Sequence, residues 1–153
     1  LLDVMSSMRA DGVIPSTMQF KGSVLLGTTS FMHLRQLAAL GADSVNIQRD
    51  MPLDMIAGFR LGSPLPIDFH ANNPDQTGGF VRTYDVPEVV RTIAPVYIKT
   101  GNVAVPKHSM MVDDSAGDLM GREVVMTVRH LQRYFPEAQQ TVAGHESLAI
   151  PEV

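Results

Sequence analysis

The stretch from Leu65 to Asp75 combines residue types that could carry out acid–base or metal chemistry. It begins as a short apolar run and ends as a polar loop that holds Asp68, His70 and Asn72. A carboxylate and an imidazole can share a divalent metal ion, or act as an acid and a base. Residues two apart in a strand point to the same face, so Asp68 and His70 would lie about 7 Å apart. The pattern predicts an enzyme-like site at a strand end, with a purely structural Asp–His pair as the alternative.

A second candidate group, Lys99, Thr100 and Gly101, lies at the end of the last predicted strand. A lysine in an apolar setting can form a Schiff base with a carbonyl substrate, and as a cation it can bind an anionic one. In barrel folds the loops after the last strands often bind phosphate, which favours anion binding by all three residues. The alternative is a lysine that simply extends its amine from the rim of the fold into water.

Other polar residues near predicted strand ends could bind the substrate. Arg49 follows the second predicted strand and Arg82 follows the pair Gly78-Gly79. Arginine suits carboxylate and phosphate groups, and paired glycines let backbone amides approach an anion. Asn72 could donate or accept a hydrogen bond, and a flexible hinge is the alternative role for the glycines. Together these residues predict a small polar or anionic metabolite as the substrate.

Apolar, strand-like runs alternate with helical patterns along the chain. We predict helices over residues 2–10, 31–40, 53–61, 86–93 and 118–134, and strands over 13–20, 44–48, 65–70 and 96–99. Ser30 is a candidate N-cap, Asp11-Gly12 a stop signal, and the pair Asp113-Asp114 a candidate cap for the last helix. Apolar residues recur along that helix at helical spacing and predict an amphipathic face: Leu119, Val124, Val125, Val128, Leu131 and Phe135.

Strands that alternate with helices predict parallel βαβ units and an α/β fold. One helix followed by four strand–helix units predicts the C-terminal half of a (β/α)8 TIM barrel, with strands five to eight. A whole barrel needs about 250 residues, and because the chain has 153 we expect a fragment. Residues 1–136 would form the partial barrel and residues 137–153 an irregular C-terminal tail. A small flavodoxin-like open sheet is the alternative.

Composition narrows the classes of function. A hydrophobic content of 44% with 18% charged residues suits a globular core. The net charge is −4 without a Lys/Arg cluster, which argues against a nucleic-acid partner. No apolar run approaches the roughly 18 residues of a membrane span, and the absence of Cys removes disulfides and thiolate chemistry. We expect a cytoplasmic protein with a small-molecule substrate, and a divalent metal ion or a homo-oligomer is left open.

Two short segments resemble sugar-phosphate enzymes. Pro66-Ile67-Asp68-Phe69-His70, with Asn73-Pro74-Asp75 after it, resembles the strand of ribulose-phosphate 3-epimerases whose His is a metal ligand. This resemblance implies a metal-bound sugar phosphate, with His70 as a ligand. Ile98-Lys99-Thr100, followed by Gly101, is similar to the Schiff-base strand of deoxyribose-phosphate aldolases and implies that role for Lys99.

A broader resemblance extends over three segments, 41–46, 78–84 and 94–99. They resemble bacterial barrel proteins grouped with the collagenase-like peptidases, although the Cys-containing signature of that family is absent here. The resemblance implies a TIM barrel with peptidase-like hydrolase activity. Three hypotheses therefore remain: a lyase or isomerase, a peptidase-like hydrolase, and a non-catalytic barrel that binds a metabolite.

Overall fold

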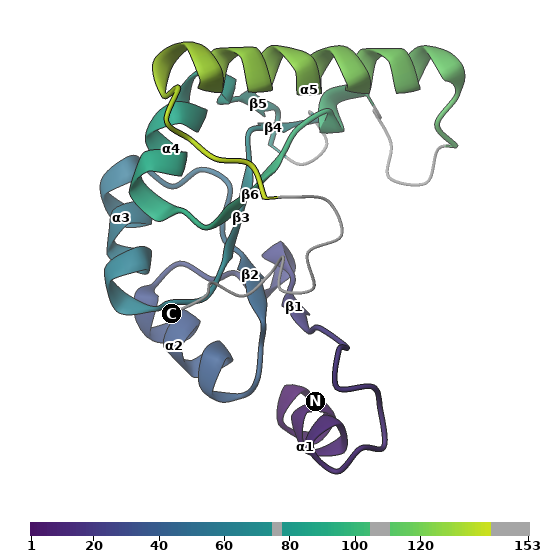
Figure 1. The fold of residues 1–153 in the computed structure, drawn as a ribbon, viewed down its shortest axis with the longest axis vertical. Helices are drawn as coiled ribbons and strands as arrows, with labels where there is room; N and C mark the ends of the chain where they lie inside the picture. The colour runs from purple at the N-terminus through teal and green to yellow at the C-terminus, as the bar shows by residue number, and fades with distance from the viewer. Residues whose placement is uncertain (75–77, 105–110, 142–153) are drawn as a thin grey trace. The chain divides into compact units, whose positions relative to one another are not determined.

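A four-stranded parallel sheet organises the protein. The computed structural model describes residues 1–74, 78–104 and 111–141. The sheet has the strand order β1-β2-β3-β6 and is formed by β1 (Lys21–Gly22), β2 (Ser44–Asn46), β3 (Ile67–His70) and β6 (Val96–Lys99) (Figure 1). The described strands do not close, because β1 and β6 are the two edges. A second, antiparallel sheet pairs β4 (Asn72–Asn73) with β5 (Phe80–Val81).

The helices alternate with the strands of the parallel sheet in the predicted order. They are α1 (Leu2–Ala10), α2 (Phe31–Ala39), α3 (Leu53–Gly62), α4 (Val86–Ile93) and α5 (Asp114–Tyr134), with short 3-10 turns η1 (Val24–Leu26), η3 (Thr83–Asp85) and η4 (Asn102–Ala104). The α/β class is therefore confirmed. Among the described helices, none has the length and apolar character that crossing a bilayer requires.

Two helix starts confirm the predicted caps. The Ser30 hydroxyl accepts a hydrogen bond from the His33 amide at 3.3 Å, at the start of α2. The Asp113 carboxylate accepts one from the Ala116 amide at 2.8 Å, so α5 begins before the predicted residue 118. The bond from Ala116, and then the bond from the Ser115 hydroxyl, lower the pKa of Asp113 below its usual value. This carboxylate is therefore a cap whose strength depends on its charge.

The first predicted strand, over residues 13–20, is wrong. Pro15 lies in the middle of this segment, and its carbonyl accepts a hydrogen bond from the Met18 amide at 3.0 Å to form a turn. Val13 is 65% exposed, so the segment lacks the burial of a parallel strand. The strand starts only at Lys21, directly after the segment. The predicted loop at Asn72 is also corrected, because this residue belongs to β4.

The described chain forms two compact units. Unit 1 contains residues 1–68 and 92–96 with Thr141, and unit 2 contains the described residues of 69–91 and 97–140. The division falls within β3, after Asp68, and within β6, after Val96. The predicted domain boundary at residue 136 does not coincide with this division, and residues 142–153 of the predicted tail lie outside the described residues.

The sheet of unit 1 has one polar and one apolar face. Strand register aligns Gly22 with Val45 and Val45 with Ile67, so these residues share the apolar face. Two successive crossovers of the same hand, each advancing one strand, place α2 and α3 on one side of the sheet, where the two helices pack against each other (Figure 1). Their buried side chains supply the core of this unit: Leu34, Leu37, Ile56 and Phe59.

Arg60 of α3 forms hydrogen bonds to backbone carbonyls from two segments of unit 1. Its guanidinium donates to the carbonyls of Ile93 at 2.6 Å and Pro95 at 3.0 Å, and to those of Ser63 at 3.3 Å and Leu65 at 3.1 Å. Burial lowers the pKa of Arg60 from its usual value, and an arginine still remains a cation at any ordinary pH. These carbonyls lie at or just after the ends of α3 and α4. The last carbonyls of a helix have no donor within the helix, and Arg60 supplies donors there.

In unit 2, α5 packs against η3 and η4, while Phe69, Val86 and Val89 are fully or almost fully buried. The only buried residue of α5 is Thr127. The predicted apolar face of this helix is therefore wrong as a core face, since four of its members are 39–48% exposed: Leu119, Val124, Val125 and Val128. The side of α5 that faces the protein is instead partly polar.

Candidate functional site

The predicted site residues fall into both units. Asp68 and Arg49 belong to unit 1, and the others belong to unit 2: His70, Asn72, Gly78, Gly79, Arg82, Lys99, Thr100 and Gly101. Asp75 of the predicted loop lies outside the described residues. Each unit therefore has its own group of polar side chains.

Asp68 in β3 is fully buried and pairs with a lysine that the sequence analysis missed. The Lys21 ammonium lies 2.9 Å from a carboxylate oxygen of Asp68, and the lysine side chain is 46% exposed. Lys21 and Asp68 stand on strands separated by β2, so the pair bridges the middle strand. A buried carboxylate is costly unless a cation or donors compensate for it, and Lys21 meets this need.

The polar face of the unit 1 sheet surrounds this ion pair. Register aligns Lys21 with Ser44 and Asn46 with Asp68, so the four side chains share one face. Ser44, Asn46 and Asp68 are all buried. The alternation Ser44-Val45-Asn46 is a sequence signal for this face, which the prediction of a strand over 44–48 did not use.

His70 ends β3 and is oriented by Asn102, the first residue of η4. The side-chain nitrogen of Asn102 lies 3.1 Å from Nδ1 of His70 and 3.4 Å from the carbonyl oxygen of Asn72. An amide nitrogen only donates, so Nδ1 of His70 accepts. In the neutral ring the proton then sits on Nε2. This makes Nε2 a hydrogen-bond donor whose ring orientation is held by a neighbouring side chain.

Asn72, in β4, holds this arrangement from inside the protein. It is fully buried, and its side-chain nitrogen donates to Thr100 Oγ1 at 3.1 Å and to Glu123 Oε2 at 3.2 Å. Its side-chain oxygen accepts from the Asn102 amide at 3.1 Å. The donors and the acceptor of the amide group are thus all used, which fixes its orientation. Asn72 was predicted to bind substrate, and in the structure its side chain supports Asn102.

Two residues of α5 complete the network, and the sequence analysis missed both. Thr127 is hydrogen-bonded to Thr100 at 3.2 Å and donates to the Glu123 carbonyl at 2.8 Å. Glu123 and Thr127 are four residues apart and so lie on the same side of the helix. Two polar residues at this spacing, between the predicted apolar positions, were the available signal.

The glycine pair serves the turn between β4 and β5. Gly78 and Gly79 have φ values of +106° and +45°, which other residues rarely adopt. The Gly79 amide donates to the Pro74 carbonyl at 3.1 Å, so it is directed into the turn. Arg82 donates from Nε to Asp85 at 2.8 Å, and its guanidinium stacks over the Phe69 ring at 5.2 Å. These contacts give the turn and Arg82 structural roles.

Lys99 and Gly101 lie at the end of β6. The Lys99 carbonyl accepts from the Ala71 amide at 2.8 Å, which ties the end of β6 to the chain just after β3. Gly101 has a φ of +84°, and an added Cβ would lie 3.3 Å from the backbone of Met120 in α5. The close approach of α5 thus explains why residue 101 is a glycine. Arg49, in unit 1, is partly buried after β2.

The metal-ligand set implied by the epimerase resemblance does not fit these residues. Metal-binding histidines usually donate from one ring nitrogen to an oxygen, so that the other nitrogen presents its lone pair. In His70 the nitrogen Nδ1 accepts, which leaves the proton on Nε2. Within residues 1–74, 78–104 and 111–141, no group of three or more His, Asp or Glu side chains could hold a metal ion.

Comparisons with known proteins return no match. Neither protein-family models, nor curated proteins, nor solved structures are similar to this chain.

Proposed function

We propose that the protein is an enzyme that acts on a small polar or anionic metabolite, with lyase or isomerase chemistry. The observation that carries the proposal is the hydrogen bond from Asn102 to Nδ1 of His70. It orients the imidazole and assigns the proton of the neutral ring to Nε2. From this position His70 donates to a carbonyl or phosphate oxygen of the substrate as negative charge develops there.

Lys99 is the second residue of the proposed site. It is the last residue of β6, just as His70 is the last residue of β3, and the bond between the Lys99 carbonyl and the Ala71 amide joins the two strand ends. Its ammonium would balance the negative charge of the substrate. With a carbonyl substrate, the same amine would form a Schiff base when deprotonated.

We further propose that the strand–helix units are of the (β/α)8 type. The strands follow one another in chain order, without the reversal that marks the switch point of a doubly wound sheet. Lys21 and Asp68 meet from alternate strands, as do the inward side chains that share a layer in barrels. In such folds the carboxyl ends of the strands carry the chemistry, where His70 and Lys99 stand.

The first test is a screen of sugar phosphates and small hydroxy acids for cleavage and isomerisation. We expect a substrate whose turnover falls by about 100-fold or more in His70→Ala, the usual contribution of a general acid or base. His33→Ala is the matched control, because His33 lies on α2 in unit 1. Turnover that His70→Ala retains would contradict the proposal, and binding without turnover would indicate a metabolite-binding module.

The second test changes the proton position rather than removing the imidazole. In Asn102→Asp a carboxylate replaces the donor, so Nδ1 of His70 must carry the proton and Nε2 becomes an acceptor. We expect nitrogen-15 NMR to show the Nε2–H form in the wild type and the Nδ1–H form in the variant, with turnover lowered in the variant. An Nδ1–H form in the wild type would contradict the proposed role.

A further inference from the structure

The side of α5 that faces the protein presents Glu123 to the buried side chain of Asn72. The side-chain nitrogen of Asn72 donates to Glu123 Oε2 at 3.2 Å. In the part of the chain that the structure describes, Glu123 takes part in no ion pair. A carboxylate only accepts, and a hydrogen bond to a charged acceptor is stronger than one between neutral groups. Because Asn72 is fully buried, its donor depends on this acceptor, and Glu123 holds one end of the amide group in place.

The second N–H of Asn72 leads back to Glu123 by a longer route. It donates to Thr100 Oγ1 at 3.1 Å, and Thr100 is hydrogen-bonded to Thr127 at 3.2 Å. The Thr127 hydroxyl donates its one proton to the Glu123 carbonyl at 2.8 Å, so the Thr100 hydroxyl must donate to Thr127. Each hydrogen bond of this ring therefore has a fixed direction, and both N–H groups of Asn72 depend on residue 123.

The other end of the Asn72 amide group places Asn102. Asn72 Oδ1 accepts from the backbone amide of Asn102 at 3.1 Å, at the first residue of η4, and η4 packs against both α5 and β4. From this anchored position the Asn102 side chain donates to Nδ1 of His70 at 3.1 Å. Three hydrogen bonds in series thus connect Glu123 to His70, and all four residues belong to unit 2.

We propose that Glu123 is a positioning residue for His70, acting through Asn72 and Asn102. Its carboxylate fixes the amide group of Asn72, which fixes the start of η4. Asn102 then keeps Nδ1 of His70 as the acceptor and leaves the proton of the neutral ring on Nε2. The consequence for catalysis rests on the proposed function, in which Nε2 of His70 donates to the substrate. The hydrogen bond to His70 can be tested without any substrate.

The first test is nitrogen-15 NMR of the whole chain, at a pH above the titration range of histidine. The readout is the scalar coupling between Asn102 Nδ2 and His70 Nδ1 across their hydrogen bond. We expect this coupling in the wild type and its loss in Glu123→Met, which keeps the length and helix propensity of the side chain but removes the acceptor. Glu123→Gln should retain the coupling, because its amide oxygen can accept from Asn72.

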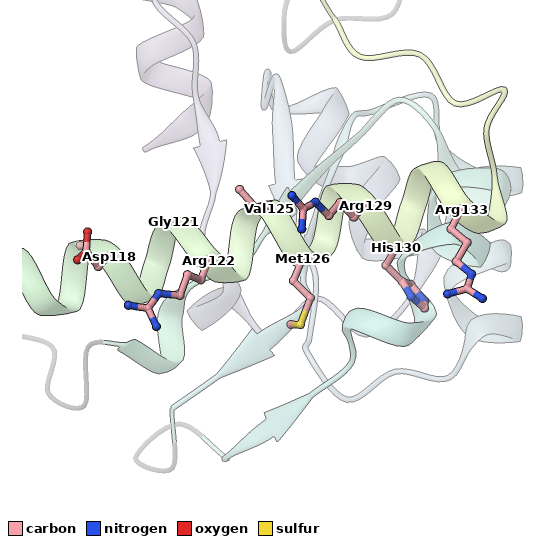
Figure 2. A pocket seen from close by; sticks show the side chains of 9 residues that line it. Asp118, Gly121, Arg122, Val125, Met126, Arg129, His130 and Arg133 are labelled. Atoms are coloured by element: carbon pink, nitrogen blue, oxygen red, sulfur yellow. The ribbon is translucent and has the colours of Figure 1, made fainter.

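Two control variants separate this route from other effects of α5. Asp118 is an exposed carboxylate of the same helix, where it lines a hollow (Figure 2), and Asp118→Ala should leave the coupling unchanged. Thr127→Val removes the hydrogen bond between α5 and Thr100 but leaves Asn72 bonded to Glu123. We expect a lower melting temperature for Thr127→Val together with a retained coupling.

A double-mutant cycle on turnover is the second test. Glu123→Met should lower kcat by about 10-fold in the wild-type background and should have no further effect in Asn102→Ala, because both substitutions break the same route. Glu123→Ala is a second variant without the acceptor and should give the same result. Circular dichroism checks that each variant keeps its helices.

Several outcomes would overturn the proposal. They are a wild type without the coupling, a coupling that persists in both Glu123→Met and Glu123→Ala, its loss in Glu123→Gln or Asp118→Ala, and an equal loss in Thr127→Val. Additive losses of kcat in the cycle would also overturn it. Failure of the proposed function looks different, because turnover would then be absent while the coupling responds to the variants as stated.

Discussion

At the residue scale, each unit contains buried polar groups that specific partners hold in place. Asn72 uses its side-chain donors and its acceptor on Thr100, Glu123 and Asn102. Arg60 donates to carbonyls at the ends of two helices. A satisfied buried group of this kind adds little net stability, but removing it leaves its partners without compensation. The largest effects of substitution are therefore expected at such residues.

Arg60→Met should lower the free energy of unfolding by about 2–4 kcal/mol. The substitution keeps most of the apolar stem but removes the Arg60 hydrogen bonds to the carbonyls of Ile93, Pro95, Ser63 and Leu65, and part-buried carbonyls that lose a donor are costly. Urea unfolding measures the change. Arg35 is an exposed residue of α2, and Arg35→Met should stay within about 0.5 kcal/mol of the wild type. Equal losses of stability in the two variants would contradict the role assigned to Arg60.

At the element scale, helix ends and helix contacts decide where each segment starts, stops and packs. Ser30 and Asp113 cap α2 and α5 through hydrogen bonds that the sequence predicts. Gly62, the last residue of α3, lies against Phe31 at the start of α2, and a Cβ added there would be 2.6 Å from Phe31 Cβ. This contact depends on two distant segments and could not be predicted from either alone.

Gly62→Ala should therefore lower the free energy of unfolding by about 1–3 kcal/mol, the usual cost of overpacking. Gly58→Ala is the matched control on the same helix, because nothing lies within 4 Å of its added Cβ. That control should be neutral or stabilising by up to about 1 kcal/mol, since alanine favours a helix over glycine. Thermal or urea unfolding distinguishes the two. If both variants gained stability, α2 and α3 would not approach each other as described.

The Asp113 cap should make the stability of α5 depend on pH. Hydrogen bonds to the Asp113 carboxylate lower its pKa in the folded state. The contribution of Asp113 to stability is therefore fully present at pH values above its unfolded-state pKa, which is near 4. This contribution is lost as the pH falls through the lower pKa of the folded state. Asp113→Asn keeps a capping side chain without a charge.

We expect the stability difference between wild type and Asp113→Asn to shrink as pH falls below about 4. This difference is measured by circular dichroism at 222 nm during urea unfolding, repeated over a pH series. A difference that does not change with pH would show that the charge of Asp113 makes no contribution.

The candidate site could be predicted only where local pattern decides it. His70 was found because a histidine two residues after Asp68 in a strand is a local signal. Asn102 was not found, because its role depends on a turn that brings η4 back beside the end of β3. Lys21 was missed for a similar reason: its pairing with Asp68 spans a strand that lies between them.

At the scale of the whole molecule, the order of strands and helices along the chain could be predicted, whereas closure of the sheet into a barrel could not. Alternation of strands and helices follows from local periodicity, and the α/β class with three of the four parallel strands, β2, β3 and β6, was predicted in this way. The strand predicted over 13–20 failed because an apolar composition outweighed Pro15 in the prediction. Whether a sheet curves into a barrel depends on edges and long-range register, for which the sequence holds no local signal.

The two units should unfold together. β3 and β6 each contribute residues to both units, so loss of either strand removes structure from both. The three tyrosines, Tyr84, Tyr97 and Tyr134, all belong to unit 2, and the chain has no Trp. Tyrosine fluorescence therefore reports on unit 2, whereas far-ultraviolet circular dichroism reports on the whole chain. The two urea transitions should coincide, and a separate tyrosine transition would contradict this expectation.

The attachment of α5 has a thermodynamic consequence. The helix buries only Thr127, and the contacts described for its inner side include the hydrogen bond that Asn72 donates to Glu123 and the one between Thr100 and Thr127. Heat-capacity changes arise mainly from the hydration of apolar surface. Because no apolar residue of α5 is fully buried, release of the helix should expose less apolar surface than unfolding of the cores, so its opening equilibrium should have a smaller heat-capacity increment. Cooling would therefore leave this helix attached while it weakens the apolar cores.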